Sequence, residues 1–583
     1  MPRSAQTDVL IVGAGPVGLT LAMDLAWRGI DVIVAERLPV DAPAGVKCGQ
    51  ISARSMEVFR RLGIARKLRA IGLPADYPND IVSATSVTGI ELSRVPIPAR
   101  GERGRAAMGE RGRAAMGERG CATEDESGSA ARDKRGCAAR GPDTSWPTPE
   151  HTHRVNQMFF APVLRAHALA QERIRILDST EVEAFEQHAQ GVTATARDLG
   201  SGEPVSIACA YLVGCDGAGS MVRKAIGAAF AGTPLLQRVQ STYFRAPGLL
   251  GMLPAKPAWN YLSLNPRRCG STLAVDGRET WIMHNFLYRG EADFDAVDRD
   301  WALREILGVG PGFRYELLSK EDWTSRRLVA DKLGERRAFI CGDAAHVWIP
   351  HGGYGMNAGI ADAANLAWKL AAALQGWGAR SLLDSYDAER QPITEQASHL
   401  ITAIGERVMA HRREISGDIE RRDAVGDATR ARIGKEAYAL DAEQQCCGGL
   451  NFGYYYDRSP AIAYDGEPQP SYTMGTFTAS TVPGCRAPHL WLEGGRSLYD
   501  AFGPGYNLLR LDPAARVTGI VEAAAARRVP LSVVDVDAGE ARDLYRHKLV
   551  LVRPDQHVAW RGDKEPPAPL DLIDRVRGGL QPG

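Results

Sequence analysis

The 583-residue sequence lacks several features that would each assign it to a distinct class of protein. Its ten cysteines are scattered and form no CxxC pair, so neither a metal cluster nor a dithiol redox motif is expected. The sequence has 70 lysine and arginine residues in total and 70 aspartate and glutamate residues, so its formal net charge is zero. This argues against nucleic acid or an anionic membrane as partner. No apolar run approaches the roughly 18 residues that cross a bilayer. We therefore expect a soluble, cytoplasmic protein with reduced thiols and no metal site.

Near its start the sequence contains a strand, a helix and a second strand in succession. Residues 8–13, DVLIVG, form a continuous apolar run typical of a strand buried on both faces. Residues 16–29 have helical apolar spacing and end at Gly29, and residues 31–37, DVIVAER, form a second apolar run. This order predicts an α/β fold whose sheet begins with parallel strands. The length favours roughly two to four domains.

Residues 101–145 break this pattern. They contain the octamer GERGRAAM twice, with half of a third copy, and then a stretch with few large apolar residues. Such a segment cannot bury enough surface to offset the entropy of ordering, so we predict a disordered surface insertion. An arginine-glycine tail that binds nucleic acid is the weaker alternative, because the segment carries glutamate and no interleaved aromatic residues.

The rest of the chain changes character twice. Residues 241–290 contain short aromatic and β-branched runs, and VDGR between two of them is a hairpin signal, so an antiparallel sheet inserted into the α/β domain is expected. Residues 380–470 are largely helical and charged, and residues 471–583 alternate strands with helices as a separate α/β domain would.

The motif GAGPVG, residues 13–18, connects the first strand to the first helix. Gly13 allows a tight turn, Gly15 allows a pyrophosphate to approach the backbone, and Gly18 allows the helix to pack on the strand. Glu36 ends the next strand, about 20 residues on, where a carboxylate would accept the ribose hydroxyls. The pattern predicts an adenine dinucleotide at the helix N-terminus, which stabilises phosphate.

A second glycine-rich turn follows a predicted strand near residue 340. The strand in RAFICGDAAH ends at Gly342 and Asp343, where a carboxylate can accept a ribityl or ribose hydroxyl. Residues 352–374 then start a helix in which Gly352, Gly353 and Gly355 present bare backbone N–H groups. A helix N-terminus stabilises negative charge, such as that of a reduced isoalloxazine ring. We therefore expect the two turns to hold the two ends of one FAD.

These motifs resemble a known family. GAGPVG with Glu36, YLVGCDGAGSMVRKAIG at 211–227 and CGDAAHVWIPHGGYGMN at 341–357 together resemble the single-component FAD-dependent aromatic hydroxylases, which include p-hydroxybenzoate and phenol hydroxylases. The resemblance covers most of residues 6–400. The C-terminal segments PGCRAPHLWLEGGRSLYDAFG and LVRPDQHVAWRGD are similar to the thioredoxin-like domain that many relatives carry, here without a CxxC and with no cysteine beyond Cys485. A structural role, such as forming a homodimer, is implied for it.

The matched motifs imply roles for individual residues. Asp343 would contact the ribityl and pyrophosphate region, and Pro350 would lie beside the flavin C4a atom, where oxygen reacts. Asp216 and Gly217 belong to a segment linked to both FAD and NAD(P)H, which Arg223 closes. The residues that the resemblance assigns to the cofactor are Gly13, Ala14, Gly15, Gly18, Glu36, Arg37, Arg54, Gln157, Asp216, Gly342, Asp343, Gly355, Met356 and Asn357.

The chemistry implied by the resemblance is aromatic hydroxylation. FAD is tightly bound and NADPH or NADH binds transiently, since no second nucleotide fingerprint is present. The reduced flavin adds O2 at C4a, and the hydroperoxide transfers oxygen to a phenolic or related aromatic substrate. The protein then supplies binding, orientation and exclusion of water.

The substrate pocket is expected on the inserted sheet. Alternation along TWIMHNFLY puts Ile282, His284, Phe286 and Tyr288 on one face, where a histidine could position a phenolic proton. A histidine that merely packs in the core is the alternative. Tyr243, Tyr261 and Trp259 could line the same cavity or fill the core, and Arg245 could hold a substrate carboxylate.

Three positions depart from the family pattern. His351 and Tyr354 stand in the flavin loop where threonine or serine and glutamine are frequent, and Ala161 stands where glutamate is usual. These departures concern the pocket and leave the flavin motifs intact. The catalytic candidates are Pro350, His284, Tyr354 and His351.

These interpretations divide the chain into several parts. The predicted ranges are 1–80, 150–230 and 325–400 for a Rossmann-type FAD-binding domain, 81–100 and 231–324 for an antiparallel-sheet substrate domain, 101–145 for the insertion, 401–470 for a helical linker and 471–583 for the thioredoxin-like domain.

Two other functions remain to be distinguished from hydroxylation. A flavin-dependent halogenase uses a similar FAD domain, but no WxWxIP-like segment is present and the PHGGYGMN loop favours the phenol hydroxylase type. A flavin-bearing sensor or interaction protein could instead use the insertion or the last domain.

Overall fold

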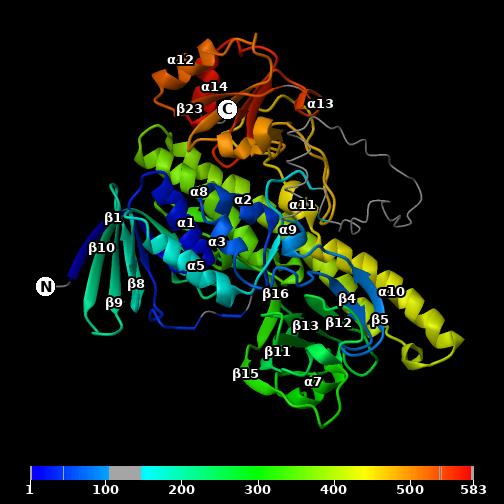
Figure 1. The fold of residues 1–583 in the computed structure, drawn as a ribbon. Helices are drawn as coiled ribbons and strands as arrows, with labels where there is room; N and C mark the ends of the chain where they lie inside the picture. Colours follow the sequence, from blue (N-terminus) through cyan, green and yellow to red (C-terminus); the bar gives the residue numbers. More distant parts are fainter. Residues whose placement is uncertain are drawn as a thin grey trace.

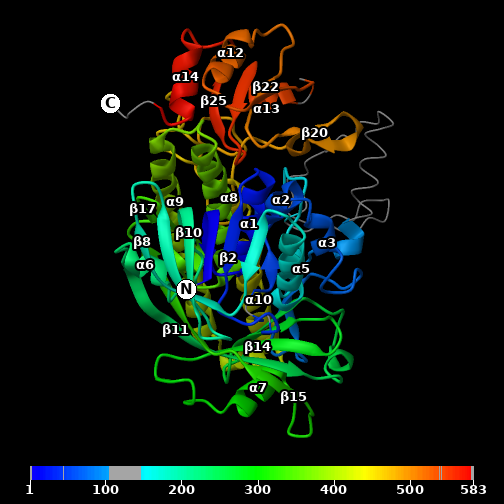
Figure 2. The same cartoon turned by 90° about the vertical axis from the view of Figure 1, so that its left-hand side faces the viewer.

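The computed structural model describes residues 3–43, 45–46, 48–103, 143, 146–537, 539 and 541–579. Most of the predicted insertion at 101–145 therefore lies outside the described residues. Figures 1 and 2 show an eight-stranded sheet with its helices in the middle of the molecule, a nine-stranded sheet at one end and the C-terminal unit at the other.

The eight-stranded sheet carries the nucleotide motifs. Its principal order is β17-β18-β10-β1-β2-β7, and the four pairs from β18 to β7 are parallel, whereas β8 and β9 extend the sheet in antiparallel fashion. This confirms the predicted α/β fold with a parallel sheet. The strands are β1 (Arg3–Val12), β2 (Val32–Ala35), β7 (Ile174–Leu177), β8 (Thr180–Gln187), β9 (Val192–Asp198), β10 (Pro204–Gly214), β17 (Gly334–Glu335) and β18 (Ala338–Ile340).

Helix α1 is buried between this sheet and its neighbouring helices. It contacts α8, α5 and β2, and eight consecutive residues from Gly18 to Leu25 are buried, which explains its apolar sequence. The helices that accompany this sheet come from distant parts of the chain. They are α1 (Pro16–Trp27), α2 (Ala53–Arg61), α3 (Ala65–Arg69), α5 (Gln157–Leu169), α6 (Met221–Ala225) and α8 (Tyr354–Leu374).

The nine-stranded sheet contains the aromatic segments at 241–290. Its order is β19-β16-β11-β14-β13-β12-β4-β5, with β15 beside β11. The pairs are antiparallel except β12 with β4, because β4 enters from a distant part of the chain rather than through a hairpin. Its elements are β4 (Ile81–Ala84), β5 (Glu91–Val95), β11 (Phe230–Arg245), β12 (Asn260–Ser263), β13 (Gly270–Ala274), β14 (Thr280–Phe286), α7 (Arg299–Leu307), β15 (Glu316–Lys320), β16 (Trp323–Ala330) and β19 (His346–Val347).

The hairpin signal VDGR lies between β13 and β14, which pair with each other. Asp276 fixes the turn, because its Oδ1 accepts bonds from the backbone N–H groups of Arg278, Glu279 and Thr280 at 2.9–3.0 Å. Strand β16 also belongs to this sheet, so part of the range 325–400 extends from the nucleotide sheet into the nine-stranded sheet.

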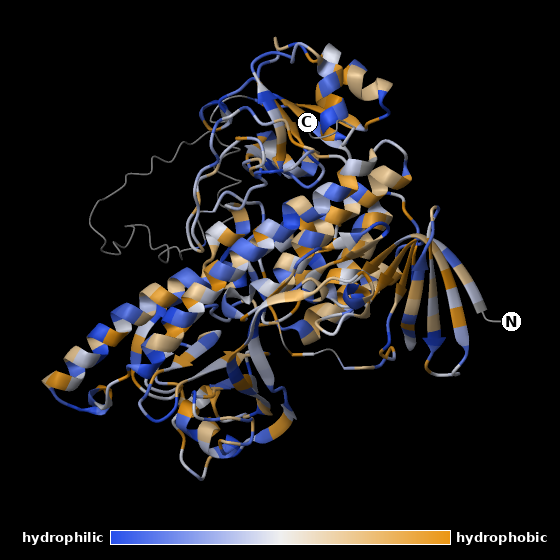
Figure 3. Cartoon of the chain, turned by 180° about the vertical axis from the view of Figure 1, so that it is seen from behind, coloured by the Kyte–Doolittle hydropathy of each residue, from blue (hydrophilic) through white to orange (hydrophobic). Residues whose placement is uncertain are grey.

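Long helices connect the two ends of the molecule. Helix α9 continues through residue 400, so the predicted boundary there falls inside a continuous helix. Helix α10 alternates polar and apolar residues, as Figure 3 shows, and packs against β5 and β4. The helices are α9 (Arg380–Arg413), α10 (Ala424–Gln445) and α11 (Gly448–Phe452).

The C-terminal unit is a small α/β layer beyond α8. Its sheet has the order β23-β22-β24-β25, with β22 and β23 parallel and the other pairs antiparallel. A short ribbon of β20 (Trp491–Leu492) and β21 (Arg496–Ser497) precedes it. The other elements are β22 (Tyr506–Arg510), α12 (Thr518–Ala526), β23 (Leu531–Asp535), α13 (Ala541–Tyr545), β24 (Leu549–Val552), β25 (Val558–Gly562) and α14 (Pro569–Val576).

No helix in the described part of the chain combines the length and the apolar character needed for a membrane span.

Candidate active site

The glycine-rich turns from distant parts of the chain meet at one edge of the eight-stranded sheet. The carboxyl ends of β1, β10 and β18 lie side by side, because β10 pairs in parallel with both neighbours. A Cβ atom on Gly13 would lie 2.4 Å from the carbonyl oxygen of Cys215, and one on Gly342 would lie 3.1 Å from Val17. The three motifs therefore form one continuous rim, which is where nucleotides bind in parallel sheets.

The GAGPVG turn has the shape that a pyrophosphate requires. Gly13 adopts a φ of +105°, and a Cβ on Gly18 would lie 2.1 Å from the carbonyl oxygen of Gly13. Gly15 faces open space, because a Cβ atom on it would meet nothing from the rest of the chain within 4 Å. It also begins α1 without a side-chain cap. The uncapped N–H groups and the open approach fit a phosphate-bearing cofactor.

Glu36 lies beside this turn at the end of β2. Its Oε2 accepts a hydrogen bond from the backbone N–H of Ala14 at 2.7 Å, and its Oε1 accepts one from Leu38 at 2.9 Å. The half-buried carboxylate is thereby fixed next to the phosphate-binding turn, and Arg37 beside it is exposed. This arrangement suits an acceptor for ribose hydroxyls.

Asp216 and Arg223 shape the middle turn. The Asp216 carboxylate accepts bonds from Ser220 Oγ at 2.6 Å and from the backbone N–H of Met221 at 2.7 Å, so it fixes the start of α6. Arg223 Nη1 donates to the carbonyl oxygen of Ala218 at 2.9 Å. The structure thus gives both side chains partners within the protein, and any contact of Asp216 with FAD stays a prediction.

The N-terminus of α8 closes the rim. Gly352 and Gly353 have φ values of +71° and +59°, which glycine adopts without steric cost, and α8 begins without a side-chain cap. Pro350 precedes this turn and is exposed, as is Asp343 in the short helix η2 (Gly342–Ala344). The first turn, which includes the predicted ring-contact residues Gly355 and Met356, therefore presents a positive helix end.

Asn357 connects this helix to the segment before α2. Its Oδ1 accepts a bond from the backbone N–H of Ser52 at 2.8 Å, and its Nδ2 donates to the carbonyl oxygen of Gly353 at 2.6 Å. The neighbouring Gln50 belongs to β3 (Gln50–Ile51), and its side chain donates to the carbonyl oxygen of Gly352. Asn357 therefore holds the turn in place, and its contact with the flavin ring stays a prediction.

Two further predicted flavin contacts, Arg54 and Gln157, lie in α2 and at the start of α5. Arg54 is buried, and its guanidinium donates to Glu57 at 2.8 Å and to the carbonyl oxygen of Asp555 at 2.8 Å. Gln157 begins α5, and its backbone N–H donates to the carbonyl oxygen of Cys48 at 2.8 Å. Arg54 thus joins the nucleotide domain to the C-terminal unit, and the flavin contacts of both residues stay predictions.

The two unusual loop residues pack among helices. His351 Nδ1 lies 2.8 Å from Gln444 Oε1 of α10, and burial lowers the pKa of His351 to about 4, with the nearby charge of Arg412 adding to the effect. The Tyr354 hydroxyl donates to the carbonyl oxygen of Leu450. Neither residue lines the larger cavities described below, so the structure does not bring them together with His284.

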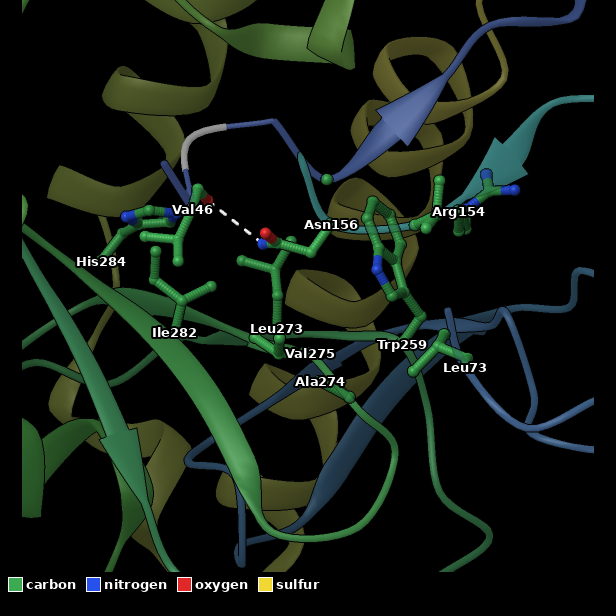
Figure 4. A pocket seen from close by; sticks show the side chains of 12 residues that line it. Val46, Leu73, Arg154, Asn156, Trp259, Leu273, Ala274, Val275, Ile282 and His284 are labelled. Carbon is green, nitrogen blue, oxygen red and sulfur yellow. Dashed lines mark hydrogen bonds between the residues drawn. The ribbon is translucent and has the colours of Figure 1, made fainter. Parts of the chain in front are cut away.

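A narrow pocket lies between the nine-stranded sheet and the segment before α2. We call it the ring cavity (Figure 4). Its wall adjoins the flavin-side turn, because Gly49 of the lining precedes Gln50, which contacts Gly352. The lining residues are Val46, Gly49, Leu73, Arg154, Val155, Asn156, Trp259, Leu273, Ala274, Val275, Ile282 and His284.

His284 contributes a neutral imidazole to this wall. Trp323 Nε1 can only donate, so Ser241 Oγ accepts its bond at 2.9 Å and has its own proton available for His284 Nδ1 at 2.7 Å. We assign the His284 proton to Nε2 from this network. Burial and, to a lesser extent, the charge of Arg412 together lower the pKa of His284 to about 4, so the imidazole is uncharged near neutral pH.

The other predicted pocket residues divide into two groups. Trp259 and Ile282 line the ring cavity, whereas Tyr243 and Tyr261 do not. Arg245 is half-exposed and pairs with Glu279 at 2.6 Å. It is therefore not placed to hold a substrate carboxylate in this cavity.

Sequence reasoning did not identify two polar residues of the lining. Arg154 lies in β6 (His153–Arg154), and Asn156 follows it and donates to the carbonyl oxygen of Val46 at 3.1 Å. Both precede Gln157 in the segment HRVNQ, where the family pattern points only to the glutamine. One sequence signal could have identified this wall: Arg154 is a charged residue in a short segment whose other residues are mostly buried.

The chain matches two family models and many characterised proteins. The FAD binding domain model matches residues 6–400, and the model of the C-terminal domain of aromatic-ring hydroxylases matches residues 480–578. Aklavinone 12-hydroxylase RdmE of Streptomyces purpurascens is 30% identical over 99% of this chain and 98% of its own. Phenol 2-monooxygenase of a Pseudomonas species is 28% identical over 98% of this chain and 93% of its own.

Solved structures agree with this similarity. RebC with bound 7-carboxy-K252c superposes with a TM-score of 0.84 at 33% identity, covering 99% of this chain and 100% of that chain. The ternary complex of aklavinone-11 hydroxylase with FAD and aklavinone has a TM-score of 0.77 at 27% identity, covering 98% of this chain and 99% of that chain.

Proposed function

We infer the substrate and the site roles from one premise: this chain belongs to the family of FAD-dependent aromatic-ring hydroxylases. It is an FAD-dependent monooxygenase, and NAD(P)H is the usual reductant of the family. The relatives are named as hydroxylases and monooxygenases, so they do not favour the halogenase alternative. Because the chain is an enzyme, a flavin-bearing sensor is not needed to explain its flavin motifs. What stays open is how the chain holds FAD and which aromatic compound it accepts.

The proposed FAD site is the rim formed by the three turns. Backbone N–H groups at the start of α1 would bind the pyrophosphate, Glu36 the ribose and Asp343 the ribityl chain. The uncapped N-terminus of α8 would stabilise negative charge on the ring. When bound, FAD supplies the redox chemistry with O2, and the chain orients the reactants and excludes water.

The proposed substrate is a phenolic compound with more than one fused ring. One observation carries this proposal: a pocket that combines apolar and aromatic walls, such as Trp259 and Ile282, with the polar group of His284 adjoins the turn that precedes α8. Apolar and aromatic side chains with a few polar groups are the usual lining of a site for a small organic ligand. Relatives named as aklavinone 12-hydroxylase and tetracenomycin B2 monooxygenase-dioxygenase, which the chain resembles over 98% or more of its length, support the larger ring system.

His284 is proposed to bind an oxygen of the substrate. With its proton on Nε2, the neutral imidazole donates a hydrogen bond to a phenolate or carbonyl oxygen in the ring cavity. A donor at this position favours the more electron-rich, deprotonated form of a phenol. Pro350, exposed ahead of α8, would shape the space above the ring.

The test follows consumption of NADPH by flavin-loaded protein with phenol, 1-naphthol and 1-hydroxyanthraquinone. We expect O2-dependent consumption with the fused-ring phenols and a product heavier by one oxygen atom. Peroxide release without a hydroxylated product from all three compounds would contradict the proposed reaction. Faster turnover of phenol than of both fused-ring compounds would contradict the proposed substrate size.

The C-terminal unit is proposed to be thioredoxin-like without redox activity. The order β23-β22-β24-β25, with one parallel pair and a helix after β22, β23 and β25, supports this assignment. A role in forming a homodimer stays part of the proposal. Light scattering of the flavin-loaded protein tests it, and a monomer at working concentration would contradict it.

A further inference from the structure

A second, narrow pocket lies next to the ring cavity and is rich in guanidinium groups. We call it the arginine cavity. Its lining combines these cations with apolar and neutral polar side chains and contains no carboxylate among the described residues. The residues are Arg69, Leu73, Pro74, Tyr77, Asn79, Arg100, Arg103, Thr152, His153 and Arg154.

The two cavities share part of their walls. Leu73 and Arg154 line both of them. The Arg154 guanidinium carbon lies 5.1 Å from the centre of the Trp259 ring. In Figure 4, Trp259, Leu73 and Arg154 lie at the end of the ring cavity opposite His284. His284 and Arg154 are therefore the polar groups at the two ends of the ring cavity.

Arg154 is buried without enough hydrogen-bond acceptors. Its side chain is 1% exposed, and its Nε and Nη1 have no hydrogen-bond partner in the described residues. Its Nη2 donates to the carbonyl oxygen of Gln445 at 3.5 Å. Asp143 Oδ2, which also has no hydrogen-bond partner among these residues, lies 3.9 Å from Nη1, close enough for an ion pair and too far for a hydrogen bond, while Asp143 Oδ1 accepts from Arg103 at 2.7 Å. Arg103 Nη1 also lacks a partner among these residues.

The other arginines of the arginine cavity also lack a carboxylate partner of their own among the described residues. Arg100 donates to the backbone carbonyl oxygens of Ile71 and Leu73 at 3.0 and 3.1 Å, and not to a carboxylate. Arg69 shares Glu150 with Arg60. Burial lowers the pKa of Arg154 and of Arg100, as expected for cations that have lost water. A buried cation without a full set of partners is costly, so an anion that enters the cavity gains the missing interactions.

We propose that the arginine cavity binds a carboxylate carried by the aromatic substrate, with Arg154 as the recognising residue. The proposal rests on the proposed function and specifies its substrate class: an aromatic acid whose phenolic oxygen contacts His284. A carboxylate matches the planar fork of a guanidinium and accepts two parallel hydrogen bonds from it. Two molecules could supply the anion, the aromatic substrate or NAD(P)H. The wall shared with the ring cavity favours the substrate, because NAD(P)H has no need to pass through the ring cavity.

The test compares two probes that differ in one negative charge and one methyl group. Calorimetry measures the binding of 6-hydroxy-2-naphthoate, whose hydroxyl and carboxylate lie at opposite ends of the ring system, and of its methyl ester to flavin-loaded protein. We expect the acid to bind at least tenfold more tightly than the ester. In Arg154→Gln this preference disappears because the dissociation constant of the acid rises about tenfold or more, while that of the ester stays unchanged. Arg154→Lys, which keeps the charge and loses the fork, should fall between the two.

Two comparisons make the result decisive. Arg245→Gln removes an exposed arginine of the same sheet and should leave the preference for the acid intact. If Arg154→Gln does not fold, the reduced preference in Arg154→Lys carries the test. An unchanged preference for the acid in both Arg154 variants overturns the proposal, as does a native protein that binds both probes equally. A higher KM for NADPH with unchanged acid binding in Arg154→Gln also overturns it and assigns the cavity to the phosphates of the reductant.

The proposal and the proposed reaction can fail separately. The binding experiment requires no turnover, so hydroxylation of neither probe would count against the reaction while leaving the acid preference measurable. Conversely, hydroxylation of the ester and the acid with equal KM would support the reaction and contradict the role of Arg154.

Discussion

Buried charges are treated differently in two regions that flank α8 and α9. At the interface with the C-terminal unit they are paired. Glu389 accepts from Arg553 Nη1 and Nη2 at 2.7 and 2.8 Å and from Lys369 Nζ at 2.8 Å, and all three side chains are fully buried. Although burial alone would raise the pKa of Glu389, the charges of Arg553 and Lys369 hold it at about 2.

Beside the nine-stranded sheet, several buried ionisable groups lack such complete pairing. Asp441 of α10 is bound only by neutral groups, Ser83 Oγ at 2.7 Å and Gln444 Nε2 at 3.1 Å, and burial raises its pKa to about 7. Arg412 Nη1 has no hydrogen-bond partner among the described residues, and Arg154 has the deficit described above.

The difference separates structural groups from groups that await a ligand. A buried ion pair that is complete needs nothing further and fixes the C-terminal unit against α8. A buried group that lacks a partner costs stability, which a bound substrate can recover. Incomplete pairing in a described cavity is therefore a sign of function, and complete pairing is a sign of architecture.

The largest effect is expected at the paired interface. Arg553→Met removes the arginine partner of Asp555 and leaves Glu389 with Lys369 as its only cation among the residues described, so we expect a loss of about 3–5 kcal/mol in the free energy of unfolding. Urea denaturation of the flavin-loaded protein measures it. Arg510→Met removes an exposed pair with Asp535 in the same unit and should leave the midpoint unchanged. Equal midpoints for both variants would show that the interface charges do not stabilise the fold.

The unpaired Asp441 should make stability depend on pH. Its folded pKa of about 7 lies above the ordinary value of 3.8, so the folded state holds a proton that the unfolded state releases between these pH values. The contribution of Asp441 to the free energy of unfolding is fully present below about pH 4. It is lost as the pH rises to about 7, by roughly 4 kcal/mol. Asp441→Asn should remove this loss, whereas the exposed Asp427→Asn on the same helix should not. Denaturation midpoints that fall equally with pH in the wild type and Asp441→Asn would exclude the effect.

The same contrast occurs within the GAGPVG turn. Gly18 is closed in by protein and Gly15 faces open space. Gly18→Ala should therefore lower the stability of the flavin-free protein by about 1–3 kcal/mol through overpacking. Gly15→Ala should leave that stability unchanged and weaken FAD binding instead. Thermal unfolding without flavin and FAD titration of each variant separate the two; tight FAD binding by Gly15→Ala would argue against the proposed pyrophosphate position.

The smallest effect is expected at His284. Loss of its hydrogen bond to a substrate oxygen in His284→Ala should lower kcat/KM about tenfold, which corresponds to about 1.4 kcal/mol. Ser241→Ala should give a smaller decrease, because it removes the group that orients the imidazole. Flavin content should stay at the native level in both variants. Equal turnover in His284→Ala and the native protein would remove this residue from the active site.

Local patterns were sufficient for the nucleotide half of the molecule. The apolar runs and glycine spacing predicted β1, α1 and β2 and the α/β class, because these features are set by neighbours within a few residues. The alternation in TWIMHNFLY led to His284, which does line the ring cavity. Tyr354 and His351 adjoin the flavin-side turn in sequence, yet their side chains are directed among α9, α10 and α11. Helix packing decides that orientation, and sequence proximity does not report it.

The sequence by itself predicted a dinucleotide site, because the turns that hold a dinucleotide require glycine at fixed spacing, and the resemblance of its three motifs identified the aromatic hydroxylases. Only the tertiary structure decided which buried charged groups have a full set of partners. Glu389 and Arg553 are far apart in the sequence and meet in a full ion pair, whereas Arg154 meets a cavity. Partners that are far apart in the sequence meet only when whole helices and strands pack. The polar residues proposed to contact the substrate could therefore be identified only from the tertiary structure.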